Sequence, residues 1–166
     1  MAWEIERRYL ARVPKRFWSD VEAGRRLRQA YIVPGPLSVR IRTGEGRGPV
    51  LTCKSGTGVR RREVETVVPD DVAEALFEAA EDRVVEKVRH RLGPWELDRF
   101  LGPLDGLVLL EIELDGEDEP IPDPPEGVAM LREVTHDNRF VSSELASMFE
   151  DTQRELVQQV YRELAV

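Results

Sequence analysis

The chain has 166 residues, of which 41% are hydrophobic and 34% charged, so it suits one ordinary domain with a core and an unusually high share of charges. Its net charge of −8 argues against a general DNA or RNA binder, because such proteins need a broad basic face. A single cysteine excludes an internal disulfide, and the chain has neither a signal-peptide start nor the ~18-residue apolar run of a membrane helix, so we expect a cytoplasmic protein with no membrane partner.

Alternation of apolar and charged residues predicts eight β-strands in the first two thirds of the chain. Their ranges are 3–10, 27–33, 37–43, 50–55, 61–68, 83–92, 95–101 and 107–114. Short turns rich in glycine and proline, such as Pro34-Gly35-Pro36 and Gly56-Thr57-Gly58, separate them. These connections favour antiparallel neighbours, because parallel strands need longer crossovers.

Helices are predicted at one place among the strands and again near the C-terminus. An acidic first turn followed by apolar residues at helical spacing predicts a helix ending at Ala80. The region 115–126 is rich in Pro, Asp and Glu and predicts an exposed connection, followed by a short helix. Further helices are expected over 143–148 and 150–164. The last is amphipathic, so it either packs over the barrel or forms the contact of a homodimer.

Charged residues within the predicted strands occur in pairs two positions apart, so both side chains of a pair lie on one face. The pairs are Glu4/Glu6, Arg40/Arg42, Glu63/Glu65, Lys87/Arg89, Glu96/Asp98 and Glu111/Glu113. One such strand is typical of a half-exposed sheet with its charges in solvent. Six strands that are each nearly pure in sign favour another arrangement, since adjacent like charges are costly unless a ligand, a metal or an oppositely charged strand neutralises them.

A closed eight-stranded antiparallel barrel with a charged lumen satisfies this pattern, because eight strands leave room for side chains and one small ligand. We therefore expect an α+β fold in which residues 1–166 form one domain, with helices outside the barrel and a C-terminal helix from about residue 150. The expected lumen charges are the acids Glu4, Glu6, Glu63, Glu65, Glu96, Asp98, Glu111 and Glu113 and the bases Arg8, Arg40, Arg42, Lys54, Lys87 and Arg89. Such bases hold phosphate oxygens and such carboxylates hold hard cations, which predicts a highly anionic ligand accompanied by Mg²⁺ or Mn²⁺.

The segment Glu4-Ile5-Glu6-Arg7-Arg8 resembles the N-terminal E-x-E-x-K strand of the CYTH, or triphosphate tunnel metalloenzyme, family. The resemblance covers about residues 3–146 and continues in order through Val39-Arg40-Ile41-Arg42, Leu51-Thr52-Cys53-Lys54, Arg62-Glu63-Val64-Glu65, Lys87-Val88-Arg89, Trp95-Glu96-Leu97-Asp98 and Glu111-Ile112-Glu113-Leu114. It implies an eight-stranded tunnel and a metal-dependent reaction at a triphosphate-containing small molecule.

Hydrolysis of inorganic triphosphate to pyrophosphate and phosphate is the activity that we favour on this resemblance. Adenylate cyclase, thiamine triphosphatase and nucleoside triphosphatase activities of the same family are the alternatives, as is a noncatalytic triphosphate-binding protein. The sequence does not rank these substrates, because the predicted site residues recognise phosphates alone.

The resemblance also implies roles for individual residues. The expected metal ligands are Glu4, Glu6, Glu111 and Glu113, with Glu63 and Glu65 holding a second metal or orienting the bases. The expected triphosphate ligands are Arg8, Arg40, Arg42, Lys54, Lys87 and Arg89. Glu4, Glu6 and Lys87 are the expected catalytic residues, with Lys87 orienting the attacking water or stabilising the leaving pyrophosphate. Arg8 departs from the final Lys of the family signature, and its longer planar fork alters how the substrate is placed.

Overall fold

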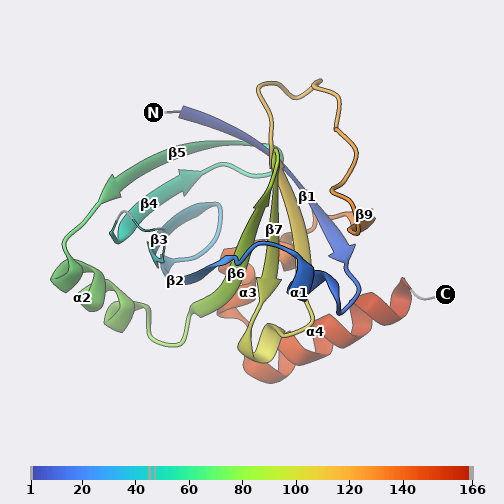
Figure 1. Ribbon diagram of the computed structural model, residues 1–166. Coiled ribbons are helices and arrows are strands. Elements are labelled where there is room, and N and C mark those ends of the chain that lie inside the picture. The colour runs from blue at the N-terminus through green and yellow to red at the C-terminus, as the bar shows by residue number, and fades with distance from the viewer. Residues whose placement is uncertain (1, 45, 47, 165–166) are drawn as a thin grey trace.

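The computed structural model describes residues 2–44, 46 and 48–164 and confirms the closed eight-stranded antiparallel barrel (Figure 1). The barrel strands are β1 (Ala2–Arg12), β2 (Arg25–Val33), β3 (Leu37–Thr43), β4 (Val50–Ser55), β5 (Arg60–Val67), β6 (Val84–Leu92), β7 (Trp95–Phe100) and β8 (Val108–Glu113). Their order around the barrel is β5-β4-β3-β2-β6-β7-β8-β1, and pairing of β1 with β5 closes the ring. Each strand begins and ends within two residues of its predicted range.

Tight turns with glycine in the left-handed region allow neighbouring strands to reverse direction. Gly44, which follows β3, has φ 106°, and a Cβ placed on it would lie 2.0 Å from the carbonyl oxygen of Arg26. Only glycine fits such a turn, because any side chain would collide with the backbone of β2.

A ninth strand, β9 (Ala129–Glu133), occupies the position where the sequence predicted a short helix, so that prediction was wrong. It pairs antiparallel with the second half of β1, with Tyr9 opposite Glu133 and Arg12 opposite Ala129. β1 is longer than its partner β5, and the backbone groups of its second half would otherwise be left unpaired. The available edge of β1, rather than local sequence preference, therefore determines the conformation of this segment.

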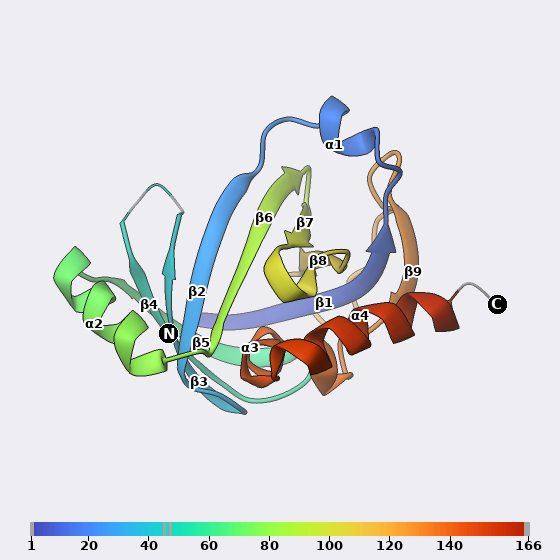
Figure 2. The same cartoon turned by 90° about the horizontal axis from the view of Figure 1, so that it is seen from below.

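In the described part of the chain, four α-helices lie outside the strands: α1 (Phe17–Asp20), α2 (Asp70–Ala80), α3 (Ser142–Ser147) and α4 (Glu150–Glu163). Short 3₁₀ turns, η1 (Gly102–Leu104) and η2 (Asn138–Phe140), precede β8 and α3. Figure 2 shows α4 crossing one side of the barrel and α1 lying on the opposite side. The apolar face of α4, formed by Leu156, Val157 and Val160, packs against the barrel core. This agrees with the first of the two predictions for this helix, that it packs over the barrel. No helix in the described ranges has the length and apolar character needed to cross a membrane.

The inward-facing residues change from charged to apolar along the strands. In β1 the charged residue Arg8 is followed on the same face by Leu10, and in β8 Glu111 is preceded by Leu109. Leu10 and Leu109 are fully buried in a core that also contains residues of α3 and α4. One part of the barrel interior is therefore an ordinary hydrophobic core, and the charged residues lie above it.

Two further apolar clusters lie on the outer face of the barrel. One, around Trp95, Leu97 and Ile112, packs against α1 and against Ile121 and Val128 of the connection before β9. The other joins β2 and β3 to α2, where Ala30 and Ile41 contact the buried face of the helix. These contacts explain why the apolar residues of the strands alternate outward while the charges face inward.

Candidate active site

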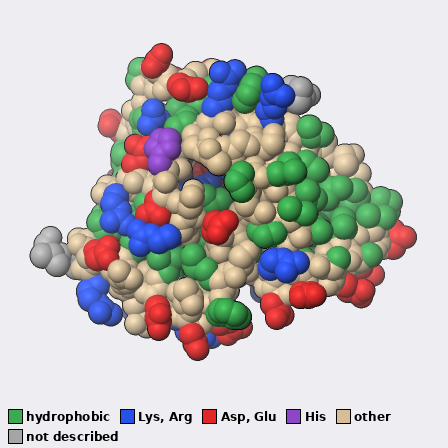
Figure 3. Space-filling model, turned by 180° about the vertical axis from the view of Figure 1, so that it is seen from behind, with side chains coloured by type: hydrophobic (Ala, Val, Ile, Leu, Met, Phe, Trp, Pro, Cys, Tyr) green, Lys and Arg blue, Asp and Glu red, His purple; other side chains and the backbone are tan. Residues whose placement is uncertain are grey.

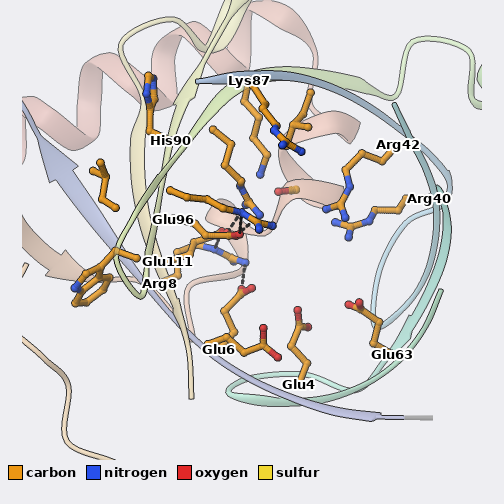
Figure 4. Close-up of a pocket in the computed structure, with 18 of the residues that line it drawn as sticks. Glu4, Glu6, Arg8, Arg40, Arg42, Glu63, Lys87, His90, Glu96 and Glu111 are labelled. Carbon is orange, nitrogen blue, oxygen red and sulfur yellow. Dashed lines mark hydrogen bonds and ion pairs between the residues drawn. The ribbon is translucent and has the colours of Figure 1, made fainter. Parts of the chain in front are cut away.

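The charged part of the barrel interior encloses a cavity of about 830 Å³ (Figure 4). All twelve residues to which the sequence assigned a site role line this cavity: Glu4, Glu6, Arg8, Arg40, Arg42, Lys54, Glu63, Glu65, Lys87, Arg89, Glu111 and Glu113. They come from β1, β3, β4, β5, β6 and β8, so only closure of the barrel brings them together.

A group of paired charges rests on the apolar core and is called here the floor network. Its members are Arg8, Lys87, Arg89, Glu96, Asp98 and Glu111. Asp98 has no solvent exposure and accepts hydrogen bonds from the Lys87 ammonium and from Arg89, whose Nε and Nη2 lie 2.7 and 2.6 Å from its two oxygens. Arg89 also donates to Glu111 over 2.8 Å and to Glu96. Three bases and three acids thus neutralise one another.

Arg8 uses the three ends of its guanidinium group for three different partners. Its Nε donates to Glu111 over 2.7 Å, its Nη2 to Glu6 over 2.6 Å, and its Nη1 to the carbonyl oxygen of Phe140 over 3.2 Å. A lysine offers one compact ammonium and could not span these positions. Arg8 therefore fixes two carboxylates of the cavity and ties η2 to the barrel.

Burial strengthens the ion pairs of the floor network. Burial alone would raise the pKa of Glu111, but Arg8, Lys87 and Arg89 outweigh it and hold that pKa well below the ordinary value. Burial opposes ionisation of Asp98 in the same way, and Arg89 and Lys87 lower its pKa. Both carboxylates remain ionised at neutral pH, and their bases are held in fixed positions.

A second group of cavity charges is called here the open cluster, because its members face the cavity rather than the core. They are Glu4, Glu6, Arg40, Arg42, Lys54, Arg61, Glu63, Glu65 and Glu113. Lys54 lies 2.8 Å from both oxygens of Glu4 and 2.6 Å from Glu63. Glu6 is directly opposite Glu113 in the β1–β8 ladder, which places two like charges side by side. Such a pair is unfavourable unless a cation lies between its carboxylates.

Glu113 is the carboxylate that this arrangement leaves without a basic partner. Within the described chain, no Lys, Arg or His lies within ion-pair distance of it. Burial raises its pKa, and the nearby charges of Glu4, Glu6 and Glu63 raise it further. An acidic group surrounded by acidic groups suits a hard divalent cation, which binds carboxylate oxygens and removes their repulsion.

In this conformation no three Asp, Glu, His or Cys side chains in the described ranges are grouped closely enough to enclose a metal ion. Glu4 and Glu6 are instead turned toward bases, since Arg61 lies 3.2 Å from each of them. The carboxylate oxygens therefore suit a divalent cation, but in this conformation Glu4 and Glu6 form ion pairs with a base instead.

Arg40 and Arg42 extend from β3 toward the middle of the cavity, opposite the floor network (Figure 4). Their distances to Glu65 are 3.8 and 3.5 Å, longer than the ion pairs of the floor. The Nε atoms of Arg40 and Arg61 are buried and have no hydrogen-bond partner among the described residues. Buried donors of this kind nearly always have an acceptor, and an anionic ligand in the cavity would supply one.

Sequence reasoning missed Arg61, which lines the cavity beside Glu4 and Glu6. The signal was present, because Arg61 lies two positions before Glu63 and so shares its inward face. Its sign differs from that of Glu63 and Glu65, and a search for pairs of like sign passes over it. Glu96 and Asp98 were expected in the lumen without a role, and both belong to the floor network.

Comparison with known proteins finds two curated relatives over most of the chain. An inorganic triphosphatase of Acetivibrio thermocellus is 34% identical over 151 residues, which are 87% of this chain and 94% of the relative. An inorganic triphosphatase of Nitrosomonas europaea is 36% identical over 129 residues, 72% of this chain and 83% of the relative. Among solved structures, that of the inorganic triphosphatase NE1496 matches 88% of this chain and 99% of its own, with 34% identity and a TM-score of 0.58. A scan against models of known protein families finds no match.

Proposed function

This chain belongs to the family of the inorganic triphosphatases, the triphosphate tunnel metalloenzymes, and on that premise we propose that it hydrolyses inorganic triphosphate to pyrophosphate and phosphate. The observation that carries the proposal is the open cluster. Basic groups with unused donors face a carboxylate set that lacks full neutralisation, inside one cavity of about 830 Å³. A linear anion of three phosphates bound with a cation would satisfy both groups at once.

The phosphate oxygens would be held by bases of the open cluster. Arg40, Arg42 and Arg61 present planar guanidinium groups that bind phosphate bidentately, and Lys54 adds a point charge between them and Glu4. Binding of the anion would compete with the carboxylates that these bases now contact. The carboxylates released in this way, Glu4 and Glu63 in particular, would become available for a cation.

Glu4, Glu6, Glu63 and Glu113 would hold a divalent cation, for which we propose Mg²⁺ or Mn²⁺. When bound, such a cation supplies neutralisation of charge on phosphate oxygens and lowers the pKa of a water molecule. Glu111 contributes indirectly, because its two oxygens are bonded to Arg8 and Arg89 and its charge fixes both bases.

Lys87 would stabilise the charge that develops on the leaving pyrophosphate. Lys87 is one of the residues that line the cavity, and its ammonium is held in place by Asp98, so it need not reorganise during the reaction. Hydrolysis of a phosphoric anhydride depends chiefly on such positioned charges and on alignment of water with the bond that breaks. The floor network beneath the open cluster would supply the positioned charges and would help to align the water with that bond.

The test is a phosphate-release assay over triphosphate, pyrophosphate, ATP, GTP and thiamine triphosphate, with and without Mg²⁺ or Mn²⁺. We expect release of one phosphate from triphosphate that stops when the metal is chelated. Formation of cyclic AMP from ATP would identify a cyclase instead. Tight binding of triphosphate in calorimetry, with no phosphate released, would identify a noncatalytic binding protein.

The single exposed thiol of Cys53 is compatible with a reducing compartment, and we propose that the protein is located in the cytoplasm.

A further inference from the structure

Exposed apolar residues lie on the outer face of β3, β4 and β5, on the part of that face that α2 does not cover. Val39, Cys53 and Val64 are direct cross-strand neighbours on this face. Leu37 of β3 is 60% exposed and Val64 of β5 is 54% exposed. Figure 3 shows hydrophobic side chains gathered on the side of the molecule where α2, β3 and β4 lie. An exposed apolar group of this kind, unlike isolated surface residues, indicates a contact with another molecule.

The two ends of this face carry opposite charges. At the end where β5 finishes, α2 begins, and it carries only acidic charges, including the exposed residues Asp71, Glu74 and Glu78. At the other end, where β5 begins, the guanidinium groups of Arg60 and Arg62 lie 4.0 and 4.8 Å from the centre of the Trp3 ring. Trp3 is itself half exposed, so a basic, aromatic edge faces solvent.

We propose that this face is the contact between two copies of the chain. A two-fold axis that lies in the plane of contact and crosses β4 near Cys53 reverses the strand direction of the second copy. The acidic end of each copy then meets the basic end of the other. A two-fold contact requires such a self-complementary surface, because the same patch serves both partners. An unrelated partner would not require opposite charges at the two ends of the surface.

Sedimentation velocity on the full chain between about 1 and 100 μM tests the proposal, and we expect a monomer–dimer equilibrium. Val64→Glu places a charge beside Cys53, next to the proposed axis, and should raise the dimer dissociation constant at least about 100-fold. Phe149→Glu makes the same chemical change at an exposed apolar residue outside β3, β4 and β5, just before α4, and should leave the constant unchanged. Circular dichroism and thermal unfolding show whether both variants remain folded.

Charge reversal tests the orientation of the two copies. Replacing Glu74 and Glu78 by Lys, or Arg60 and Arg62 by Glu, should weaken the dimer about 10-fold in each case, and combining both sets should restore most of the loss. A short bismaleimide should join two copies through Cys53, and Cys53→Ser should abolish this product. The proposal is overturned by a monomer over the whole concentration range, by a dimer that survives Val64→Glu, or by a dimer that Phe149→Glu disrupts.

Discussion

The floor network and the open cluster are built from the same residue types, yet they meet different demands. Floor charges lie on the apolar core, where an unpaired ion would be costly, and each is bonded to an ion of opposite sign. Charges of the open cluster line the cavity, where Glu113 faces other acids and the Nε atoms of Arg40 and Arg61 lack partners among the described residues. Pairing secures the fold in the first region, and incomplete pairing prepares a binding site in the second.

Asp98→Asn should have the largest effect, because it breaks the pairing of the floor. Lys87 and Arg89 would keep their charges in a buried position without their shared acid, so we expect the free energy of unfolding to fall by about 3–5 kcal/mol. Urea denaturation measures the change. Asp151→Asn, the same replacement at an exposed acid of α4, is the control and should leave the midpoint unchanged.

Glu113→Gln tests the opposite expectation for the open cluster. Removing a charge that repels its neighbours should leave stability equal or slightly higher, while kcat/KM for triphosphate falls about 100-fold or more because a cation ligand is lost. Phosphate release titrated with Mn²⁺ measures the effect. The matched control is Glu86→Gln, which alters an acid paired with Arg26 outside the cavity and should retain activity. If Glu113→Gln unfolds the protein, or retains full activity, Glu113 does not have this role.

Arg8→Lys probes the junction between the two regions. A lysine keeps the charge but loses the simultaneous bonds to Glu6, Glu111 and the Phe140 carbonyl, so the free energy of unfolding should fall by about 1–2 kcal/mol. Thermal unfolding measures this loss. Arg7→Lys, at the neighbouring residue whose guanidinium bonds Glu133 outside the cavity, should have a much smaller effect. Equal effects of the two variants would contradict a special role for the Arg8 fork.

Lowering the pH should affect the open cluster before it affects the floor network. The folded-state pKa of Glu113 is raised, so its carboxylate is protonated, and metal affinity decreases, at a pH above the ordinary Glu value of about 4.3. The pKa values of Asp98 and Glu111 are lowered, so their contribution to stability is present above the unfolded-state values near 4 and is lost only as the pH falls toward the folded-state values. Metal titrations and circular dichroism at each pH should show loss of metal binding before loss of the fold. The reverse order would contradict the assignment of the two regions.

Much of the fold could be predicted because the strand period is local information. Alternation within each strand, glycine at the turns and paired charges such as Arg40 and Arg42 identify eight strands and their inward faces. All twelve predicted site residues line the cavity for the same reason. A charge two positions from another must share its face, whatever the rest of the chain does.

Which charges meet across the barrel is a different kind of information. Arg8 and Glu111 are neighbours because β1 pairs with β8, and Arg61 reaches Glu4 because β5 closes on β1. Because β5 pairs only with the first half of β1, β9 pairs with the second half, although the local sequence predicted a helix at β9. No spacing along one strand specifies such partners.

The sequence by itself determined that this protein forms a barrel with charged residues inside, because side-chain alternation needs only neighbouring residues. Tertiary structure alone decided which of those charges are neutralised and which face the cavity. The reason is physical: the pKa and the pairing of each group depend on burial and on residues brought from distant strands, as the contrast between Glu111 and Glu113 shows.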